Sequence, residues 1–508
     1  MNLAIDNNAT SGHQAIRLDQ LFEGIDCEIK DNISDIEING LSNDSRKVKP
    51  GDLFFAVPGF AVDGARFIPE ATSLGAKAVI TQADVNGLDY IPIIRCGNIR
   101  PVMSQVAARF YRHPSKDIKV VGITGTNGKT TVTFLLAHIL GSAKKTWGKI
   151  GTVEYFTGKR TIRAINTTPD TLELQEYLAE MRDSGLVGCV MEVSSHGLDQ
   201  HRCDDIKFSA GVFTNLTQDH LDYHRDLESY FKAKSILFTD LLKEDGIAVL
   251  NANDPHYEKL SAICPHKIIS YSVVADVRQK YAADLIIEDK GYSDNQRHFK
   301  ISYAGKSCDG VMPHLGKFNL ANAGAAISTA IGLGYDFDKA IDLLSNAPQV
   351  PGRVEKVIMG QPYEVIIDYA HTPDALENLL TGVDTSGKKI LVFGCGGDRD
   401  KTKRPIMGQV AVKYADKVII TSDNPRNEEP GRIITDIQKN IGGESEYSVI
   451  EKREEAISQA LAIASTGDLV IIAGKGHEDY QIVGNTRHYF SDQNVVKTVL
   501  KKMGYAGT

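Results

Sequence analysis

Residues 119–140 read KVVGITGTNGKTTVTFLLAHIL: an apolar strand, a glycine-rich loop and an apolar helix in direct succession. We predict a strand over Lys119–Thr124, a loop over Gly125–Thr131 and a helix over Val132–Leu140. Glycines let backbone N–H groups turn towards phosphates, and a helix N-terminus adds partial positive charge. The common phosphate-loop pattern has glycine where this chain has Ile123. Strand, loop and helix together still favour nucleotide phosphates over a plain turn.

Short apolar runs alternate with longer helical patterns on both sides of this segment. The alternation is typical of α/β units with mostly parallel sheets. The predicted strands outside the phosphate loop are Asp52–Val57, Ala76–Ile80, Gly188–Val193, Ala210–Asn215, Ile247–Asn251, Lys267–Ser272, Glu364–Asp368, Lys389–Phe393, Lys417–Thr421 and Asp468–Ala473. Further helices are expected over Pro101–Arg112 and Asn322–Leu333.

With 508 residues the chain is too long for one compact core, and roughly 150 residues per domain suggests about three domains. We predict an N-terminal domain over residues 1–113, a central ATP-binding domain over residues 114–348 and a Rossmann-like C-terminal domain over residues 349–508. The boundaries rest on the proline-containing turns His113-Pro114-Ser115 and Ala347–Gly352.

The composition excludes several classes of protein. A net charge of -8 argues against a nucleic-acid-binding surface. The seven cysteines are scattered and never form CxxC, which suits reduced thiols in a cytoplasm and speaks against structural zinc. The first thirty residues are polar and acidic, and no apolar stretch approaches 18 residues. We therefore expect no signal peptide and no membrane span, and a protein that acts in the cytoplasm. We separately expect a monomer.

The last four predicted strands each end in a polar or glycine-rich loop. In open α/β sheets, ligands bind at the carboxyl ends of the strands, so these loops should line one pocket. The loops are Tyr369-Ala370-His371, Gly394–Arg399, Ser422–Arg426 and Gly474–Glu478.

The loop form Thr-Gly-Thr-Asn-Gly-Lys-Thr-Thr resembles that of the Mur ligases and their relatives, the folylpolyglutamate synthetases. The resemblance extends in order over nearly the whole chain, which is far more specific than one motif. The matching segments are Asp44-Ser45-Arg46, Asn166–Pro169, Glu192–Leu198, Asn215–His220, Lys234, Asn322, Pro351-Gly352-Arg353, Asp368–Pro373 and Asp423-Asn424-Pro425-Arg426.

The resemblance implies an ATP-dependent ligase with Mg²⁺ that joins a carboxylate to an amine. A carboxylate is a poor electrophile, so attack on the γ-phosphate first gives an acyl phosphate, which the amine displaces. This chemistry needs cations around the phosphoryl group more than a protein nucleophile. By similarity, Lys129 contacts the β- and γ-phosphates, and Thr130, Glu192, His220 and a carbamylated Lys234 hold the metal ion. The alternatives are that Glu192 caps a helix, that His220 pairs with Asp219 or Asp222, and that Lys234 is a surface lysine.

The other substrate sites also follow from the resemblance. The residues implied for ATP are Gly125, Thr126, Asn127, Gly128, Lys129, Thr130, Thr131, Asn322, Arg353 and Asp368, with His371 as a further candidate. The residues implied for the UDP-muramyl dipeptide are Ser45, Thr167, Thr168, Ser194, Gln200 and Arg202, and its uridine is expected beside the loop Gly59–Gly64. Arg202 suits a carboxylate or pyrophosphate because its guanidinium presents a fork of donors.

The loop Ser422–Pro430 resembles the motif of the family branch that adds meso-2,6-diaminopimelate during peptidoglycan synthesis. Diaminopimelate differs from lysine by one carboxylate, which an arginine can bind with two hydrogen bonds. The residues implied for this amino acid are Arg399, Asp423, Asn424, Pro425, Arg426, Gly474 and Glu478. The bland alternative is an Asx-Pro turn followed by a surface arginine.

Competing functions remain open at this point. The nearest are the lysine-adding ligase and a folylpolyglutamate-synthetase-like ligase. A P-loop ATPase without an acyl acceptor would not need the four C-terminal loops. A dinucleotide-dependent oxidoreductase rests on Gly394–Gly397, but Arg399 occupies the last glycine position of the GxGxxG pattern.

Overall fold

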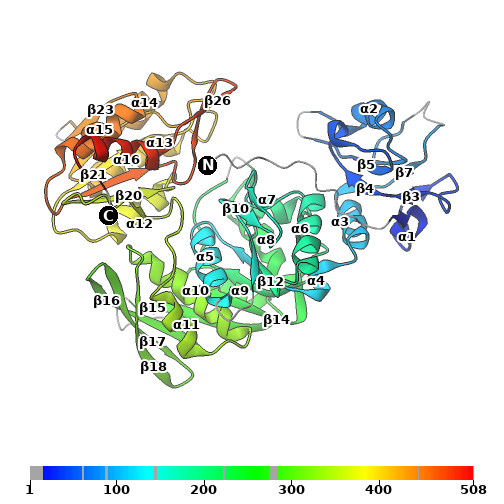
Figure 1. Cartoon of the computed structure of the whole chain (residues 1–508), viewed down its shortest axis with the longest axis horizontal. Helices are drawn as coiled ribbons and strands as arrows, with labels where there is room; N and C mark the ends of the chain where they lie inside the picture. Colours follow the sequence, from blue (N-terminus) through cyan, green and yellow to red (C-terminus); the bar gives the residue numbers. More distant parts are fainter. Residues whose placement is uncertain are drawn as a thin grey trace. The chain divides into compact units, whose positions relative to one another are not determined.

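The predicted succession of strand, loop and helix over residues 119–140 is confirmed, although the helix begins at Lys129, three residues earlier than predicted. In the computed structural model, β8 (Lys119–Thr124) leads through the glycine-rich loop into α5 (Lys129–Gly141), the helix labelled α5 in Figure 1. The structure describes residues 15–59, 62–85, 90–141, 146–220, 223–274, 283–443 and 446–506. Phe60 and Ala61 of the expected uridine loop, and Asp222, lie outside these residues.

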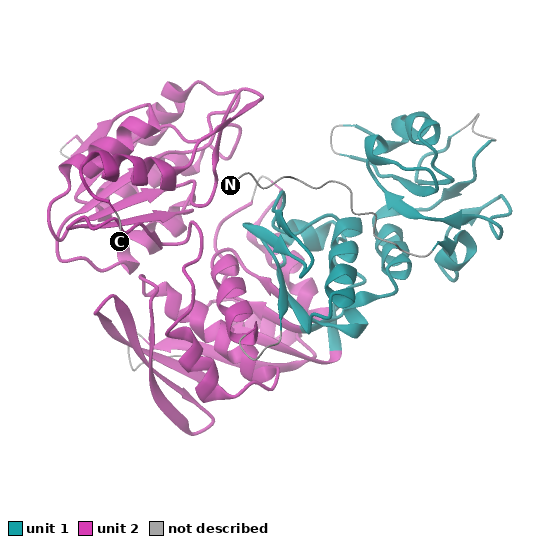
Figure 2. Cartoon of the chain, in the orientation of Figure 1, with its two compact units in different colours: residues 1–121, 146–209, 240–243 teal, residues 122–145, 210–239, 244–508 magenta. Residues whose placement is uncertain are grey.

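The chain divides into two compact units, coloured separately in Figure 2. Unit 1 comprises residues 1–121, 146–209 and 240–243, and unit 2 comprises residues 122–145, 210–239 and 244–508. The chain passes between them within β8 and β13 (Phe208–Phe213) and near the start of β14 (Leu242–Asn251). The two boundaries between the three domains expected from the sequence stay predictions.

The N-terminal part of unit 1 is a small sheet with a hydrophobic cluster on each face. Its strand order is β2-β7-β6-β5-β4, parallel except for the edge strand β2. Leu53 and Phe55 face one cluster while Phe54 and Ala56 face the other, which is the alternation of a strand buried on both sides. The elements are β1 (Ile16–Arg17), α1 (Leu18–Phe22), β2 (Glu28–Ile29), β3 (Glu37–Ile38), β4 (Gly40–Ser42), β5 (Asp52–Ala56), α2 (Ile68–Ser73), β6 (Ala78–Thr81), β7 (Ile93–Arg95), α3 (Ile99–Phe110) and α4 (Pro114–Asp117).

The rest of unit 1 supplies strands that end near the expected precursor residues. Here β12 is parallel to β9, and β9, β10 and β11 form antiparallel pairs. Asp170 caps α6 by accepting a hydrogen bond from the N–H of Leu172. The elements are β9 (Trp147–Ile150), β10 (Glu154–Phe156), β11 (Thr161–Arg163), α6 (Thr171–Asp183), β12 (Gly188–Glu192) and α7 (Ser195–Asp199).

The first sheet of unit 2 carries the phosphate loop. Strand β8 neighbours β13, and β14, β15 and β16 run parallel before β16, β17 and β18 turn back as antiparallel strands. The small residues of α10 let it pack closely, since Gly324 abuts Tyr271 and Gly332 abuts Ile247. The further elements are α8 (Leu227–Thr239), α9 (Tyr257–Ile263), β15 (Lys267–Val274), β16 (Leu285–Ser293), β17 (Gln296–Tyr303), β18 (Lys306–Met312), α10 (Phe318–Gly332) and α11 (Phe337–Leu344).

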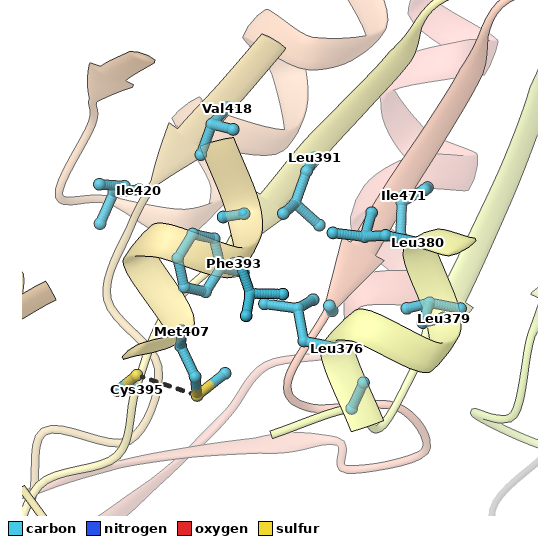
Figure 3. Packing of buried hydrophobic residues seen from close by; sticks show 14 of the residues in the cluster. Leu376, Leu379, Leu380, Leu391, Phe393, Cys395, Met407, Val418, Ile420 and Ile471 are labelled. Carbon is cyan, nitrogen blue, oxygen red and sulfur yellow. Dashed lines mark hydrogen bonds between the residues drawn. The ribbon is translucent and has the colours of Figure 1, made fainter. Parts of the chain in front are cut away.

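The second sheet of unit 2 is Rossmann-like, as predicted, with the order β19-β20-β24-β21-β22-β23 and only β19 antiparallel. Its strands alternate between two clusters, so helices cover both faces. Figure 3 shows one cluster, where Cys395 Sγ lies 3.6 Å from Met407 Sδ. The elements are β19 (Glu355–Lys356), β20 (Glu364–Asp368), α12 (Pro373–Gly382), β21 (Lys389–Phe393), α13 (Lys403–Tyr414), β22 (Lys417–Ile420), α14 (Pro430–Gln438), β23 (Tyr447–Val449), α15 (Arg453–Ile463), β24 (Leu469–Ala473), β25 (Tyr480–Val483), β26 (Thr486–Tyr489) and α16 (Asp492–Lys502).

The predicted strands are all present, with ends that differ by a few residues. The hairpins β16–β18 and β25–β26, the strands β9–β11 and several helices were not predicted. Among the described residues, no helix is long and apolar enough to cross a membrane. All seven cysteines are free thiols in the structure.

Candidate functional site

The glycines of the phosphate loop occupy positions that no other residue could take. Gly125 and Gly128 have φ angles of 146° and 87°, in the region that favours glycine. A Cβ atom on Gly125 would lie 1.9 Å from Thr214 Oγ1, and one on Gly128 would lie 2.4 Å from Asn322 Oδ1. The loop is thus folded tightly against the residue after β13 and against α10.

The segment after β13 holds the phosphate loop in shape. The N–H of Thr126 donates to Asn215 O, and the N–H of Asn127 donates to Asn215 Oδ1, both at 2.8 Å. The Thr214 hydroxyl donates to Asn127 O at 2.6 Å. Asn215 belongs to a matching segment in the sequence, and its role here is to brace the loop.

Lys129 is the first residue of α5, at the helix N-terminus. Its Nζ atom donates to Gly125 O at 2.8 Å and to Thr126 O at 2.9 Å, both carbonyls of the loop itself. The ammonium group and the helix N-terminus therefore concentrate positive charge at one place, which suits phosphate oxygens.

Lys234 is buried in α8 and is not a surface lysine, because only 2% of the residue is exposed. Its Nζ atom donates to Gly125 O at 2.9 Å and lies 4.4 Å from the centre of the Tyr230 ring. Burial lowers the pKa of Lys234 well below its usual value, and the nearby Lys129 lowers it further. The neutral amine, which is the form that reacts with CO₂, is therefore favoured.

His220 follows β13 in a left-handed backbone conformation, with a φ angle of 54°. Its Nε2 atom lies 3.5 Å from Asp219 Oδ2. Loss of solvent lowers the pKa of His220 to about 4, against the opposing effect of Asp219. The imidazole is thus neutral near pH 7, as a metal ligand must be.

Three predicted ATP residues lie around the same loop within unit 2. Arg353 Nη2 donates to the Thr130 hydroxyl at 3.2 Å, and its guanidinium lies 4.6 Å from the centre of the Tyr369 ring. Asp368 ends β20 and accepts from the N–H groups of Val354 and Ala370. Asn322 abuts Gly128 and donates to Asn319 Oδ1. His371 Nδ1 lies 2.9 Å from Tyr369 O, and burial lowers its pKa.

The carboxylate of Glu192 is held at the end of β12 in unit 1. Glu192 is 1% exposed, and Thr152 donates to it from its N–H at 2.8 Å and from its hydroxyl at 2.9 Å. The Thr152 hydroxyl also lies 3.2 Å from the Thr167 hydroxyl. Because Glu192 belongs to unit 1 and Thr130 to unit 2, their shared role at a metal ion stays a prediction.

The predicted precursor residues of the central segment form one network in unit 1. The Thr168 hydroxyl contacts Glu192 O at 3.0 Å and Ser194 Oγ at 3.1 Å. Arg202 donates to Thr168 O at 2.8 Å and to Gln200 Oε1 at 2.7 Å. These residues surround the end of β12.

The hydroxyl of Ser45, another predicted precursor residue, donates to Glu70 Oε2 at 2.5 Å. The neighbouring Asn43 donates to Asp170 Oδ1 at 2.9 Å, two residues beyond Thr168. The loop of the small N-terminal sheet is thereby tied to the start of α6.

The four C-terminal loops do meet at one edge of the second sheet in unit 2. Asn424 Nδ2 donates to Glu478 Oε2 at 3.0 Å, and the N–H of Gly397 donates to Asn424 O at 2.9 Å. The N–H of Gly474 donates to Asp368 O at 3.1 Å. Asp423 is buried beside Gly474. A Cβ atom added to Gly474 would lie 3.0 Å from Asp423 Oδ2.

Arg426 has a constrained backbone, not that of an ordinary surface turn. Its φ angle is 51°. Its N–H donates to Ile482 O at 3.1 Å, and its carbonyl accepts from the N–H of Gly484 at 2.7 Å. Its Nη1 atom donates to Gly397 O at 2.8 Å. Gly397 must be glycine, because a Cβ atom would lie 1.9 Å from Pro425 O. Arg399 is exposed on the same loop.

Three residues of the site were missed by the sequence reasoning: Thr152, Asp374 and Lys475. Thr152 holds Glu192, Asp374 contacts the phosphate loop, and Lys475 lies between Asn424 and Glu478. Only Lys475 had a sequence signal, since it stands within the predicted loop Gly474–Glu478.

Comparison with family models gives three matches in order along the chain. The Mur ligase family catalytic domain matches residues 37–123, the Mur ligase middle domain residues 123–330 and the Mur ligase glutamate ligase domain residues 352–476.

Individual proteins are similar over nearly their whole length. The UDP-N-acetylmuramoyl-L-alanyl-D-glutamate–2,6-diaminopimelate ligase of Geobacter sulfurreducens is 42% identical over 484 residues, covering 90% of this chain and 93% of the relative. The ligase of the same name from Synechococcus elongatus is 43% identical over 481 residues, covering 92% and 94%. A solved structure of a ligase with this name matches with a TM-score of 0.68 at 32% identity, covering 97% of this chain and 100% of that chain.

Proposed function

This chain belongs to the Mur ligase family and is an ATP-dependent ligase, and we propose that it joins meso-2,6-diaminopimelate to the D-glutamate of UDP-N-acetylmuramoyl-L-alanyl-D-glutamate. The product belongs to peptidoglycan synthesis. The observation that carries the choice of amino acid is the loop cluster around Arg426, where Arg426 Nη1 donates to Gly397 O and Asn424 Nδ2 donates to Glu478 Oε2.

The positive and negative charges of this loop cluster match those of the amino acid. Diaminopimelate carries two carboxylates and two ammonium groups. Arg426 and the exposed Arg399, whose side chains both lie near Gly396, supply positive charge for the distal carboxylate. Glu478 and Asp423 supply carboxylates for the distal ammonium group. Lysine, which lacks the distal carboxylate, would leave Arg426 unpaired.

The phosphate loop is proposed to bind ATP through its backbone N–H groups, Lys129 and Arg353. Lys129 at the N-terminus of α5 stabilises the charge on the β- and γ-phosphates as the precursor carboxylate attacks the γ-phosphate. Arg353 already contacts Thr130 from the second sheet of unit 2, so it can reach the same phosphates. Asn322 and Asp368 are proposed for the adenosine part.

The donor set also suits Mg²⁺, which prefers oxygen ligands and would neutralise phosphate charge when bound. Thr130, Glu192 and His220 are the proposed protein ligands, with the carbamate of Lys234 adding oxygens. The buried, neutral-favoured amine of Lys234 fits that modification. Thr152 keeps both oxygens of Glu192 oriented.

The precursor is proposed to bind unit 1 through Ser45 and the network of Thr167, Thr168, Ser194, Gln200 and Arg202. The guanidinium of Arg202 would meet the anionic part of the precursor. We also propose the domain boundaries at residues 113/114 and 348/349, a monomer and a cytoplasmic location, where the UDP-linked substrate would be made.

A substrate panel tests the carboxylate substrate directly. The purified chain is given ATP and diaminopimelate with the UDP-muramyl dipeptide, with a folate or with neither, and phosphate release is measured. We expect release only with the UDP-linked dipeptide. Release with the folate but not with the dipeptide would favour a folylpolyglutamate-synthetase-like ligase, and release with neither would favour a plain ATPase.

A further inference from the structure

Lys475 is a buried cation to which the proposed chemistry gives no role. It follows β24 in the loop Gly474–Glu478, and its side chain is 0% exposed. Its Nζ atom lies 3.2 Å from Asn424 Oδ1 and 3.4 Å from Glu478 Oε2. The ring of Tyr480 lies beside it, with the ring centre 5.5 Å from Nζ. Lysines are almost never fully buried unless they are paired, so this placement needs a reason.

Glycines stand on either side of Lys475 in the chain. Gly474 and Gly476 have φ angles of 112° and 53°, which glycine adopts without strain. A Cβ atom on Gly476 would lie 2.8 Å from Gly352 O, so the loop is also packed closely against the chain before β19. Lys475 therefore stands between two glycines in a closely packed loop.

The orientation of the Asn424 amide follows from the same contacts. The N–H of Ile482, which can only donate, lies 3.0 Å from Asn424 Oδ1. The Lys475 ammonium is also only a donor, so both groups require the amide oxygen at this position. The amide nitrogen is thereby directed at Glu478 Oε2, 3.0 Å away.

We propose that Lys475 is a positioning residue for the incoming amino acid, acting through Asn424 and Glu478. This inference rests on the proposed function, in which those two residues bind diaminopimelate. Lys475 holds the amide and the carboxylate in one arrangement and balances the negative charge of Glu478 next to Asp423. A buried ion pair is a weak source of stability, because desolvation opposes the attraction. Its contribution lies in the geometry of the site.

Lys475→Met tests the inference, because methionine keeps the length of the side chain and removes the charge. Each of the three substrates is varied in turn under steady-state conditions. We expect the KM for diaminopimelate to rise about 10- to 100-fold, the effect of losing a hydrogen bond to a charged group, with the KM values for ATP and the precursor unchanged. Lys452→Met is the matched control, since that side chain is 78% exposed on the same part of unit 2.

A double variant shows whether Lys475 acts through Glu478. If it does, Lys475→Met should cost little more in a Glu478→Gln background, because the residues work as a unit. Three results would each overturn the inference. The first is that the effects of the two substitutions on KM multiply in the double variant. The others are an unchanged KM for diaminopimelate in folded Lys475→Met, or equal increases in KM for all three substrates. Should Lys475→Met not fold, Lys475→Gln is judged by the same criteria.

The use of diaminopimelate by the wild type is measured first. This measurement separates a failure of the inference from a failure of the proposed function on which it rests. A wild type that does not use diaminopimelate overturns the proposed function. A wild type that uses it, together with an unaltered Lys475→Met, overturns only the role of Lys475.

Discussion

Asp374 Oδ2 accepts a hydrogen bond from Asn127 Nδ2 at 2.9 Å, so the first helix of the Rossmann-like sheet touches the phosphate loop. The same oxygen accepts from the Thr217 hydroxyl at 3.0 Å. Thr217 in turn accepts, through its carbonyl, from the Thr126 hydroxyl at 3.2 Å. One carboxylate of α12 thus braces both segments that shape the loop.

We predict that Asp374→Ala raises the KM for ATP about tenfold, because hydrogen bonds to a charged group are lost at the loop. Steady-state kinetics with ATP varied is the measurement. Asp338→Ala is the control, since Asp338 also lies in the first turn of a helix, α11, but is exposed. Equal changes in both variants would mean that a helix-terminal charge matters and the contact with Asn127 does not.

Lys129→Ala should lower kcat/KM by about 100-fold or more, the cost of removing one preorganised charge partner from a phosphoryl-transfer site. The folded state should survive, because Lys129 is only partly buried and its ammonium group donates to carbonyls of the loop itself. Phosphate release and a thermal melt are measured together. Near-normal turnover in the folded variant would remove the phosphate-loop assignment.

Lys234→Ala should lose most activity, and acetate should restore part of it by supplying carboxylate oxygens in place of a carbamate. The reason is the buried amine beside Gly125, whose pKa lies well below its usual value. Trapping of ¹³CO₂ on the wild-type lysine, read by mass spectrometry, gives a check that does not depend on turnover. Full activity of the variant without acetate, or no trapped label, would argue against carbamylation.

His314 should make the fold less stable in mild acid. It is 6% exposed, its Nε2 atom lies 3.0 Å from Pro348 O, and burial lowers its pKa to about 4 from the usual 6.5. Because the unfolded chain takes up the proton first, stability is complete above pH 6.5 and falls as the pH drops from 6.5 towards 4.

The Tm measured at several pH values checks this prediction. His314→Gln should show a smaller fall in Tm between pH 7 and pH 5 than the wild type. The control His488→Gln changes an exposed histidine and should behave like the wild type. A fall of equal size in all three proteins would show that His314 does not contribute.

The sequence predicted the buried strands well, because each is a short apolar run bounded by turn residues. β8, β20 and β21 have the predicted ends. The strands β16–β18 are partly exposed, and their apolar residues are interspersed with polar and charged ones, with no run longer than Leu285–Ile287. The turn Asp294-Asn295, with both φ angles positive, is a hairpin signal that could have revealed them.

Site residues could be predicted where they belong to a sequence motif. They could not be predicted where only the fold brings residues together. The network of Thr168, Ser194 and Arg202 was expected from the family resemblance. Asp374 and Thr152 could not be, because each acts on a partner that is distant in sequence, Asn127 and Glu192 respectively. Such contacts depend on sheet order, which local patterns do not encode.

Arg426→Ala should weaken the use of diaminopimelate about 100-fold or more in kcat/KM, chiefly through KM, because two charge-assisted hydrogen bonds are lost. Any residual use of lysine should hardly change, since lysine lacks the distal carboxylate. Phosphate release with each amino acid is measured for both proteins. Equal losses of kcat/KM for the two amino acids would mean that Arg426 does not bind the substrate. Its role would then be to shape its own loop, whose backbone is hydrogen-bonded to Ile482.

The most direct test of the central claim is the kcat/KM of the wild type for diaminopimelate compared with lysine and ornithine, with the UDP-linked dipeptide and ATP saturating. The mass of the product identifies which amino acid has been joined. A strong preference for diaminopimelate, with ADP and phosphate formed in step with the tripeptide product, is the predicted result. A preference for lysine would contradict the assignment of Arg426 and of the amino acid, while leaving the ligase family in place.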